Sequence, residues 1–423
     1  MRRFYLACIV AAACLLSAGA EGWDELYKAR LNASSAWLEA KLALRTAEVA
    51  WYQFSKPLSP TVTIATSGSS GLGWGSDGYS GGLVPSLTFE NLYGTDLAIK
   101  TPLVASSSGA IGLGDPSLSL SRNLFVETDA DRLDAEAAFI TARAAVRKAE
   151  DSVRLALATE VLNAVYYESL LEANQRDLAV LEKVKAATVD PTSLRELEKR
   201  ILGARRSILA ASANLMGIDQ AINKDIEALY EDVLSFQAEW TSSIDADKAA
   251  VSLAIQALEL SLAAAEKREG FSILPFLPNP NLTASLSYDL DKGEIGWGLG
   301  ISMSFTILDK GERSLAALKR EEHPKIYRAK LADARRELSD SIRNARNTIA
   351  TLELDRKIQE LEIADYADEV NILAALFKGG YTSEENLVIA QIDVSIEQLK
   401  AKKIDYDVLI QKLNLASYLN TEE

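Results

Sequence analysis

Residues 281–290 read NLTASLSYDL, residues 295–307 read IGWGLGISMSFTI, and these two stretches decide the fold. In both, apolar residues alternate with small or polar ones. Because successive side chains of a strand point to opposite faces, each stretch has one apolar face and one small or polar face. The turn at 291–293 joins them into a β-hairpin. This alternation is typical of membrane-spanning strands, and half-buried sheets of soluble domains show it too.

The hairpin belongs to a plan that occurs twice in the chain. Each half is predicted to hold an alanine-rich helix, a break rich in proline, a β region and a pair of long helices, and such a repeat defines the structural unit. The first repeat covers 21–243, with a helix at 24–54, a β region at 61–125, a helical hairpin at 128–215 and a linker after it. The second covers 244–423, with a helix at 251–267, the β-hairpin at 281–307 and a helical hairpin at 312–419.

The first β region is rich in glycine, serine, threonine and aromatic residues. Its extended runs, predicted as strands, are residues 61–67, 83–93, 96–104 and 117–125. Seven glycines lie between Gly68 and Gly82, a density that favours a flexible, exposed loop.

The helical hairpins are unusually long. Residues 128–187 form one predicted helix of ~90 Å at 1.5 Å per residue, followed by a turn at 189–193 and a return helix from 194. In the second half, a helix from 311 to 377 is expected to be interrupted at His323-Pro324, since proline lacks a backbone N–H. Glycines 379 and 380 end it, and Ser383 caps the last helix. Helices of this length bury their apolar stripes against one another as antiparallel coiled coils.

The first 20 residues are predicted to be a signal peptide. Two arginines precede an apolar run at 4–16, and small residues permit cleavage after Ala20. Cleavage removes Cys8 and Cys14; the alternative is that Cys14 is the acceptor of a lipid. No later segment has the ~18 apolar residues of a spanning helix. Because only helices and closed barrels span membranes, an exported chain with such strands is expected to form a barrel.

The composition argues against several functional classes. The formal net charge of −15 does not suit nucleic acid as a partner. The only histidine, His323, lies in a charged helix and is expected at the surface, and the mature chain has no thiol, so a histidine or thiolate metal site is not expected. No phosphate loop or nucleophile motif is present. We therefore predict no cofactor, no metal and no enzymatic activity.

Three segments carry a resemblance to a known family. They are 305–313, FTILDKGER; Gly380-Tyr-Thr-Ser383 with Asn386, Leu387, Ala390 and Gln391; and Asp405-Tyr406 with Leu409 and Leu413. Together with the internal repeat, they resemble the TolC-like outer-membrane efflux proteins. The resemblance implies a mainly α fold with a membrane β-barrel portion. Each of three copies supplies four strands to a twelve-stranded barrel and long helices to a periplasmic tunnel; six strands per copy is a minor alternative.

The resemblance also implies a function. The chain is expected to be the exit duct of a tripartite efflux pump or type I secretion system, which passively exports small molecules or proteins. Its location is the outer membrane, in contact with lipid and extending into the periplasm. The expected partners are two further copies, a periplasmic adaptor protein and an inner-membrane transporter. The alternative is a periplasmic coiled-coil adaptor or structural protein without a pore.

Two candidate sites follow from the resemblance. The adaptor-docking tip comprises Gly380, Tyr381, Thr382 and Ser383, with Asp190, Pro191 and Thr192 at the degenerate tip of the first repeat. The periplasmic gate comprises Glu385, Asn386, Ile389 and Asp393. Asn386 and Ile389 stand where the family carries acidic residues, so Glu385 is the expected source of negative potential.

Overall fold

The computed structural model describes residues 22–66, 73–75, 78–106, 111–189, 191–241, 252–271, 273–303 and 310–419. The predicted signal peptide, with both cysteines, lies outside these residues, as does most of segment 305–313. The fold is mainly helical with one antiparallel sheet, as predicted. The chain divides into two compact units. Unit 1 is Met1–Leu38, Arg147–Ser252 and Glu337–Glu423, and unit 2 is Glu39–Val146 and Leu253–Arg336, so each unit takes segments from both predicted repeats.

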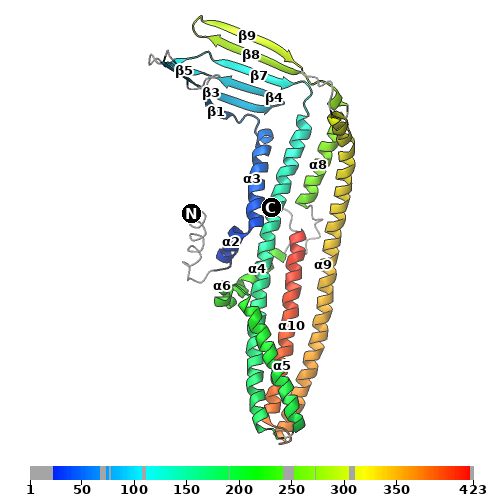
Figure 1. Ribbon diagram of the computed structural model, residues 1–423. Helices are drawn as coiled ribbons and strands as arrows, with labels where there is room; N and C mark the ends of the chain where they lie inside the picture. The colour runs from blue at the N-terminus through cyan, green and yellow to red at the C-terminus, as the bar shows by residue number, and fades with distance from the viewer. Residues whose placement is uncertain are drawn as a thin grey trace. The chain divides into compact units, whose positions relative to one another are not determined.

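The sheet lies in unit 2 (Figure 1). Its strands are β1 (Thr61–Thr66), β2 (Gly73–Gly75), β3 (Gly78–Leu92), β4 (Thr95–Lys100), β5 (Leu103–Ser106), β6 (Ile111–Leu113), β7 (Ser117–Asn123), β8 (Asn281–Asp289) and β9 (Glu294–Ser302). All neighbouring strands pair antiparallel. The hairpin that the alternation predicted, β8 with β9, is confirmed, and Gly293 takes the positive φ of 69° that its turn requires.

The nine strands occupy six positions across the sheet, here called rows, because some strands lie end to end along the same edge of a neighbour. Strands β1 and β2 share one edge of β3, and β4 and β5 share the opposite edge, because Leu83 pairs with Thr66 on one side and Leu103 on the other. Strand β6 pairs with β5 and β7 with β4, so the rows are β1 with β2, β3, β4 with β5, β6 with β7, β8 and β9. Pro102 and Pro116, which lack a backbone N–H, stand where two rows break. The sheet of one chain thus has six rows, the number of the minor alternative, where four strands were expected.

The glycine-rich loop predicted at 68–82 is also corrected. Residues 73–75 and 78–82 form β2 and the start of β3, and the remaining residues lie outside the described part. Gly81 and Gly82 pair with Ala105 and Val104 of β5. Pairing within a sheet uses backbone N–H and C=O groups, so a glycine-rich run becomes part of a strand when its neighbours supply the partners.

Four helices continue below the sheet in unit 2: parts of α3 (Ser35–Ser55), α4 (Thr128–Ala187) and α9 (Glu312–Lys378), and all of α8 (Leu253–Glu269). The helices pack against one another through small buried side chains, among them Ala137, Ala264 and Ala265. Ion pairs flank these contacts: Lys267 with Asp129, Arg328 with Glu266 and Arg335 with Glu259. In the described part of the chain, none of the helices has the length and apolar character that crossing a membrane requires.

Unit 1 contains the main apolar core. It holds α2 (Trp23–Ala33), α5 (Pro191–Met216), α6 (Gln220–Lys224), α7 (Ile226–Thr241), α10 (Glu384–Leu419) and the remaining parts of α4 and α9. Leu157, Leu162, Ile222, Val233 and Leu413 are fully buried in this core. The segment predicted as a linker therefore forms helices α6 and α7, because its regularly placed apolar residues pack against α2, α4 and α10.

Two predictions about helices fail. The single helix predicted at 24–54 is divided into α2 and α3 (Ser35–Ser55) at Ser34, whose extended backbone ends α2 and whose hydroxyl accepts a hydrogen bond from the N–H of Trp37 at 3.3 Å. Helix α9 continues through Pro324, where an interruption was expected. The Pro324 side chain is fully buried, and we attribute the continuity of the helix to this packing, which offsets the lost hydrogen bond. His323 is exposed, as predicted.

Candidate functional site

The two faces of the sheet differ sharply in composition, and the register shows it across all six rows. One cross-strand line runs through Val62, Leu87, Ile99, Leu118, Leu286 and Trp297. All six are apolar and none is buried; Val62 is 68% exposed and Trp297 76% exposed. The next line on the other face runs through Thr61, Thr88, Ala98, Ser119, Ser285 and Gly298, which are all small.

Glycines and hydroxyls pack together on the small face of the β8–β9 hairpin. A Cβ built on Gly296, Gly298 or Gly300 would lie 2.8–3.0 Å from the hydroxyl of the residue opposite it in β8. Each glycine thus makes room for a hydroxyl that lies flat on the sheet. A large exposed apolar face opposite such a thin polar face matches a wall with lipid on one side and water on the other.

The second helical tip is built by the end of α9. The N–H of Tyr381 donates to the carbonyl of Leu376 at 2.9 Å, and the N–H of Gly380 donates to Phe377 at 3.0 Å. These two bonds with Gly380 at φ +77° form a Schellman motif, which satisfies the last carbonyls of the helix. Tyr381 is 83% exposed, and its ring lies against Gly379, where an added Cβ would come within 2.8 Å.

The start of α10 completes this tip. The Ser383 hydroxyl accepts a hydrogen bond from the N–H of Asn386 at 3.4 Å, so Ser383 caps the helix as predicted. The Asn386 side chain donates to the Thr382 hydroxyl at 3.3 Å. Glu384 and Glu385 occupy the first turn, where a helix favours negative charge.

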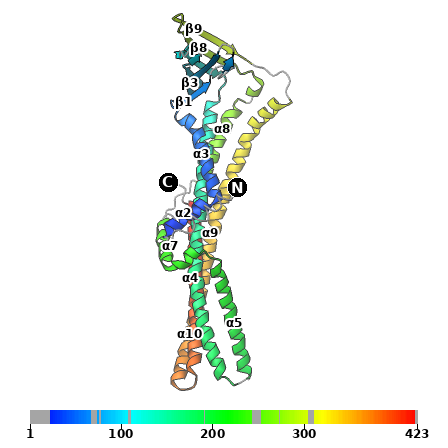
Figure 2. The ribbon, with the colours of Figure 1, turned by 60° about the vertical axis from the view of Figure 1, so that its left-hand side comes forward.

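The first tip differs in its chemistry. Helix α4 ends at Ala187 and α5 begins at Pro191, three residues before the predicted start. Proline suits the first position of a helix, since the N–H that it lacks would have no partner there. Pro191 and Thr192 are exposed, and Asp190 lies outside the described residues. Figures 1 and 2 both place the two tips side by side at one end of unit 1.

The four predicted gate residues fall into two pairs. Glu385 and Asn386 are exposed near the tip. Ile389 packs against a small apolar cluster of Leu181, Ile201 and Ala204, and Asp393 forms an ion pair with Arg200 of α5. The structure therefore brings Ile389 and Asp393 into the packing between α4, α5 and α10, and leaves Glu385 and Asn386 on the surface.

A partly buried charge cluster, which sequence reasoning missed, includes Asp393. Arg200 lies between Asp393 and Asp177 of α4, whose side chain is only 7% exposed. The Asp177 Oδ1 and Arg200 Nε face each other at 4.0 Å, and neither atom has a hydrogen-bond partner among the described residues. Burial raises the pKa of the Asp177 carboxyl, Arg200 opposes the increase and Asp393 adds to it. Acidic residues on amphipathic helices are usually solvated, so no sequence signal singled Asp177 out.

A second buried polar contact joins α9 to α10. The Gln359 side chain donates to the Glu397 carboxylate at 2.9 Å, and both residues are buried. Lys400 pairs with the same carboxylate at 2.7 Å. Glu397 lies four residues beyond Asp393, on the same stripe of α10, so this stripe packs through polar contacts as well as apolar ones.

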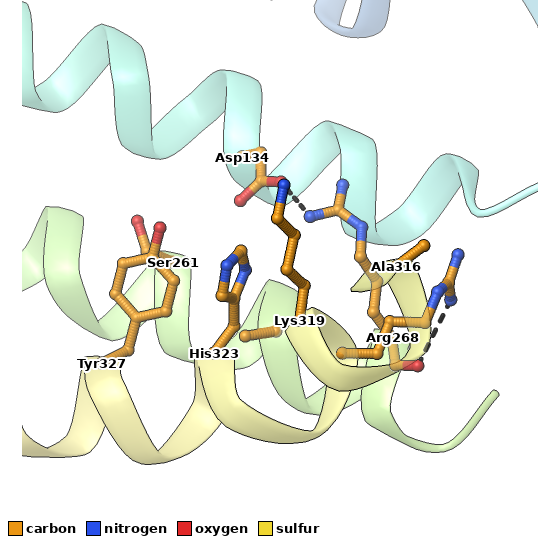
Figure 3. Close-up of a pocket in the computed structure, with 9 residues that line it drawn as sticks. Asp134, Ser261, Arg268, Ala316, Lys319, His323 and Tyr327 are labelled. Atoms are coloured by element: carbon orange, nitrogen blue, oxygen red, sulfur yellow. Dashed lines mark hydrogen bonds and ion pairs between the residues drawn. The ribbon is translucent and has the colours of Figure 1, made fainter. Parts of the chain in front are cut away.

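A pocket in unit 2 lies between α4, α8 and α9 (Figure 3). Its lining includes Arg268, Arg320 and His323. Arg268 pairs with Asp131 at 2.7 Å and with Asp134, and Arg320 donates to both oxygens of Glu127 at 2.5 and 2.7 Å. These carboxylates neutralise the arginines, so the pocket is a joint between helices held by ion pairs. Among the described residues, no group of histidine, cysteine, aspartate and glutamate is arranged to hold a metal ion.

Comparisons with known proteins bear on the fold. Neither a protein-family model nor a curated protein matches the sequence. Among solved structures, the chain is similar to the outer membrane protein VceC from Vibrio cholerae, with 14% identity and a TM-score of 0.58 over 95% of this chain and 99% of VceC. It is also similar to the outer membrane channels MtrE of Neisseria gonorrhoeae (15%, 0.57, 94% and 89%) and CmeC of Campylobacter jejuni (15%, 0.56, 92% and 84%). The predicted resemblance to TolC-like outer-membrane proteins is thus confirmed for the fold.

Proposed function

We propose that this protein is an outer-membrane channel, the exit duct of a tripartite efflux pump or type I secretion system. The observation that carries the proposal is the exposed apolar line from Val62 to Trp297, backed by a line of small residues. In water such a face would be unfavourable, whereas in lipid it is the favoured arrangement. The fold shared with VceC, MtrE and CmeC supports the same function. Transport through the duct is passive, without catalysis or a cofactor.

The proposal includes a homotrimer in the outer membrane, with helices in the periplasm. The open edges of the sheet need partners in lipid, and three copies supply them. The test is to purify the protein from outer membranes in detergent, measure its mass and record conductance in planar bilayers. A trimer that forms discrete channels is expected. A stable monomer without conductance would contradict the duct and favour a periplasmic adaptor or structural protein.

The two tips are proposed to dock a periplasmic adaptor, which links the duct to an inner-membrane transporter. Their exposure and their position beside each other in unit 1 support this role. Replacing Gly380 and Thr382 with bulky charged residues should abolish export while leaving folded trimer in the membrane. Unchanged export would show that the turn only connects two helices.

Glu385 is proposed as the source of negative potential at a periplasmic constriction. It is exposed beside Asn386, and a threefold ring would present it three times to ions, as in other charged pores. Glu385→Gln should lower cation selectivity in single-channel recordings. Unchanged selectivity would leave Glu385 only its favourable position at the start of a helix.

A further inference from the structure

The number of rows in the sheet has a consequence for the width of the channel. We infer that all six rows of each copy form the channel wall, so that a closed ring of three copies has eighteen strands. This inference rests on the trimeric duct of the proposed function. Because the diameter of a barrel grows roughly linearly with strand number, the mouth is about 1.5 times as wide as one of twelve strands.

The continuity of the two faces is the first support. The apolar line passes from Val62 in the first row to Trp297 in the last, through one directly paired residue in every row. The small line from Thr61 to Gly298 does the same on the other face. If the first rows were a plug or a surface loop, nothing would align their apolar residues with those of the β8–β9 hairpin. Every row therefore meets the requirement of a lipid-facing wall.

The edges of the sheet are the second support. Among the described residues, β1 pairs only with β3 and β9 pairs only with β8, so each end row has a line of backbone groups without partners. The occupant of each edge is a second copy of this chain. Since each row is antiparallel to the next and the rows are six, the first and last rows run in opposite directions. Strand β9 of one copy therefore continues the antiparallel order when it pairs with β1 of the next, which an odd number of rows would not allow.

The residues of the small face indicate what kind of cargo can pass through such a wide channel. Thr61, Thr88, Ser119 and Ser285 supply hydroxyls, while Ala98 and Gly298 add little volume. At eighteen strands the interior is too wide for side chains of this size to fill and remains aqueous. The wall thus suits bulky polar cargo that moves with its water, and the wall itself does not set the size limit for export.

Disulfide trapping in outer-membrane vesicles tests the inference on the full chain. Val62→Cys in β1 is combined in turn with Ile295→Cys, Trp297→Cys, Leu299→Cys or Ile301→Cys in β9. These four positions share the apolar face with Val62, and together they cover the unknown register between copies, since a disulfide requires Cβ atoms about 3.5–4.5 Å apart. The matched control places the first cysteine in an inner row, Leu97→Cys of β4, with the same four partners. Each single variant controls for the native cysteines.

We expect at least one Val62 combination to shift the chain from monomer to covalent dimer and trimer on non-reducing gels, and no Leu97 combination to do so. Cross-links from Leu97 would show that β9 meets an inner row and would overturn the six-row wall. A ladder that ends at two chains, or no cross-link in any folded variant, would overturn it as well. Bilayer conductance of the same samples separates this failure from failure of the duct: a conducting channel cross-linked through Leu97 contradicts only the row count.

Discussion

The sheet of unit 2 and the helical end of unit 1 place their polar and apolar residues in opposite ways. The sheet exposes large apolar side chains such as Val62 and Trp297, whereas the helical end encloses Asp177, Gln359 and Glu397 between helices. An exposed apolar face is favourable only where the surroundings are apolar. An enclosed charge is unfavourable unless a partner compensates it. The difference indicates that the two regions are built for different surroundings, lipid for the sheet and water for the helices.

The largest expected effect tests the sheet side of this comparison. Leu286→Lys puts a charge on the apolar face and should destabilise the assembled protein by about 2–4 kcal/mol, the cost of a lysine facing lipid at mid-depth. The matched control is Ser287→Lys, one residue further along β8 and on the small face. The folded oligomer extracted from outer membranes should fall strongly in the first variant and little in the second. Equal losses would show that the two faces meet the same solvent.

The next effect tests the helical side. Arg200→Met leaves Asp177 and Asp393 without their cation and should cost about 1–3 kcal/mol, because the buried carboxylate loses its partner. Arg205→Met is the control, since Arg205 and Glu182 form an ion pair that is more than half exposed, and the expected cost is below about 1 kcal/mol. The readout is the temperature at which the folded oligomer dissociates. Similar shifts in both variants would mean that the cluster behaves like a surface pair.

A smaller effect is expected at the second tip. Gly380→Ala forces an L-residue to φ +77° and should destabilise the end of α9 by about 1 kcal/mol. Gly203→Ala in α5 has the opposite sign: nothing lies within 4 Å of the added Cβ, and alanine favours a helix by about 0.8–1 kcal/mol over glycine. Local hydrogen exchange at the two helices measures both changes. A stabilised Gly380→Ala variant would contradict the Schellman geometry.

The smallest effect concerns pH. The pKa of Asp177 is raised by burial, so the folded protein holds this proton to higher pH than the unfolded chain does. Stability is therefore lost as pH rises from the ordinary carboxyl pKa, roughly 4, through the raised value. Asp177→Asn removes that loss and should be slightly more stable than the wild type at pH 7.5, with the difference disappearing near pH 4. A variant that is less stable at pH 7.5 would show that the attraction of Arg200 outweighs burial.

Sequence reasoning succeeded where one local rule decides the structure. The hairpin at 281–307 follows from alternation with period two, and Gly380 with Ser383 marks the end of one helix and the start of the next. It failed where tertiary partners decide. Gly81 and Gly82 extend β3 because β5 supplies their hydrogen bonds. The expected strand number came from the resemblance, although the four extended runs of the first β region and the hairpin together already make six. Periodicity did not reveal that α6 and α7 pack into the core.

The candidate site shows the same division. The tip residues Thr382 and Ser383 were named from the resemblance, and turn chemistry alone predicted only that Ser383 caps the last helix. Asp177 and Arg200 were missed, because a charge on an amphipathic helix looks alike in sequence whether a neighbouring helix covers it or not. Asp393 was predicted as a gate residue without its partner Arg200, since the two come from helices whose contact no sequence motif records.

The pairing of β7 with β8 sets the order in which the protein can mature. Ser121 and Asn281 are hydrogen-bonded neighbours in the sheet but lie 160 residues apart in the chain. During export the first repeat emerges before the second, so β7 waits with an open edge while the intervening helices are still being translocated. Contacts this distant in sequence form slowly, and unpaired edges promote aggregation. The slow step of maturation is therefore expected to be the arrival of β8 and β9 beside the open edge of β7.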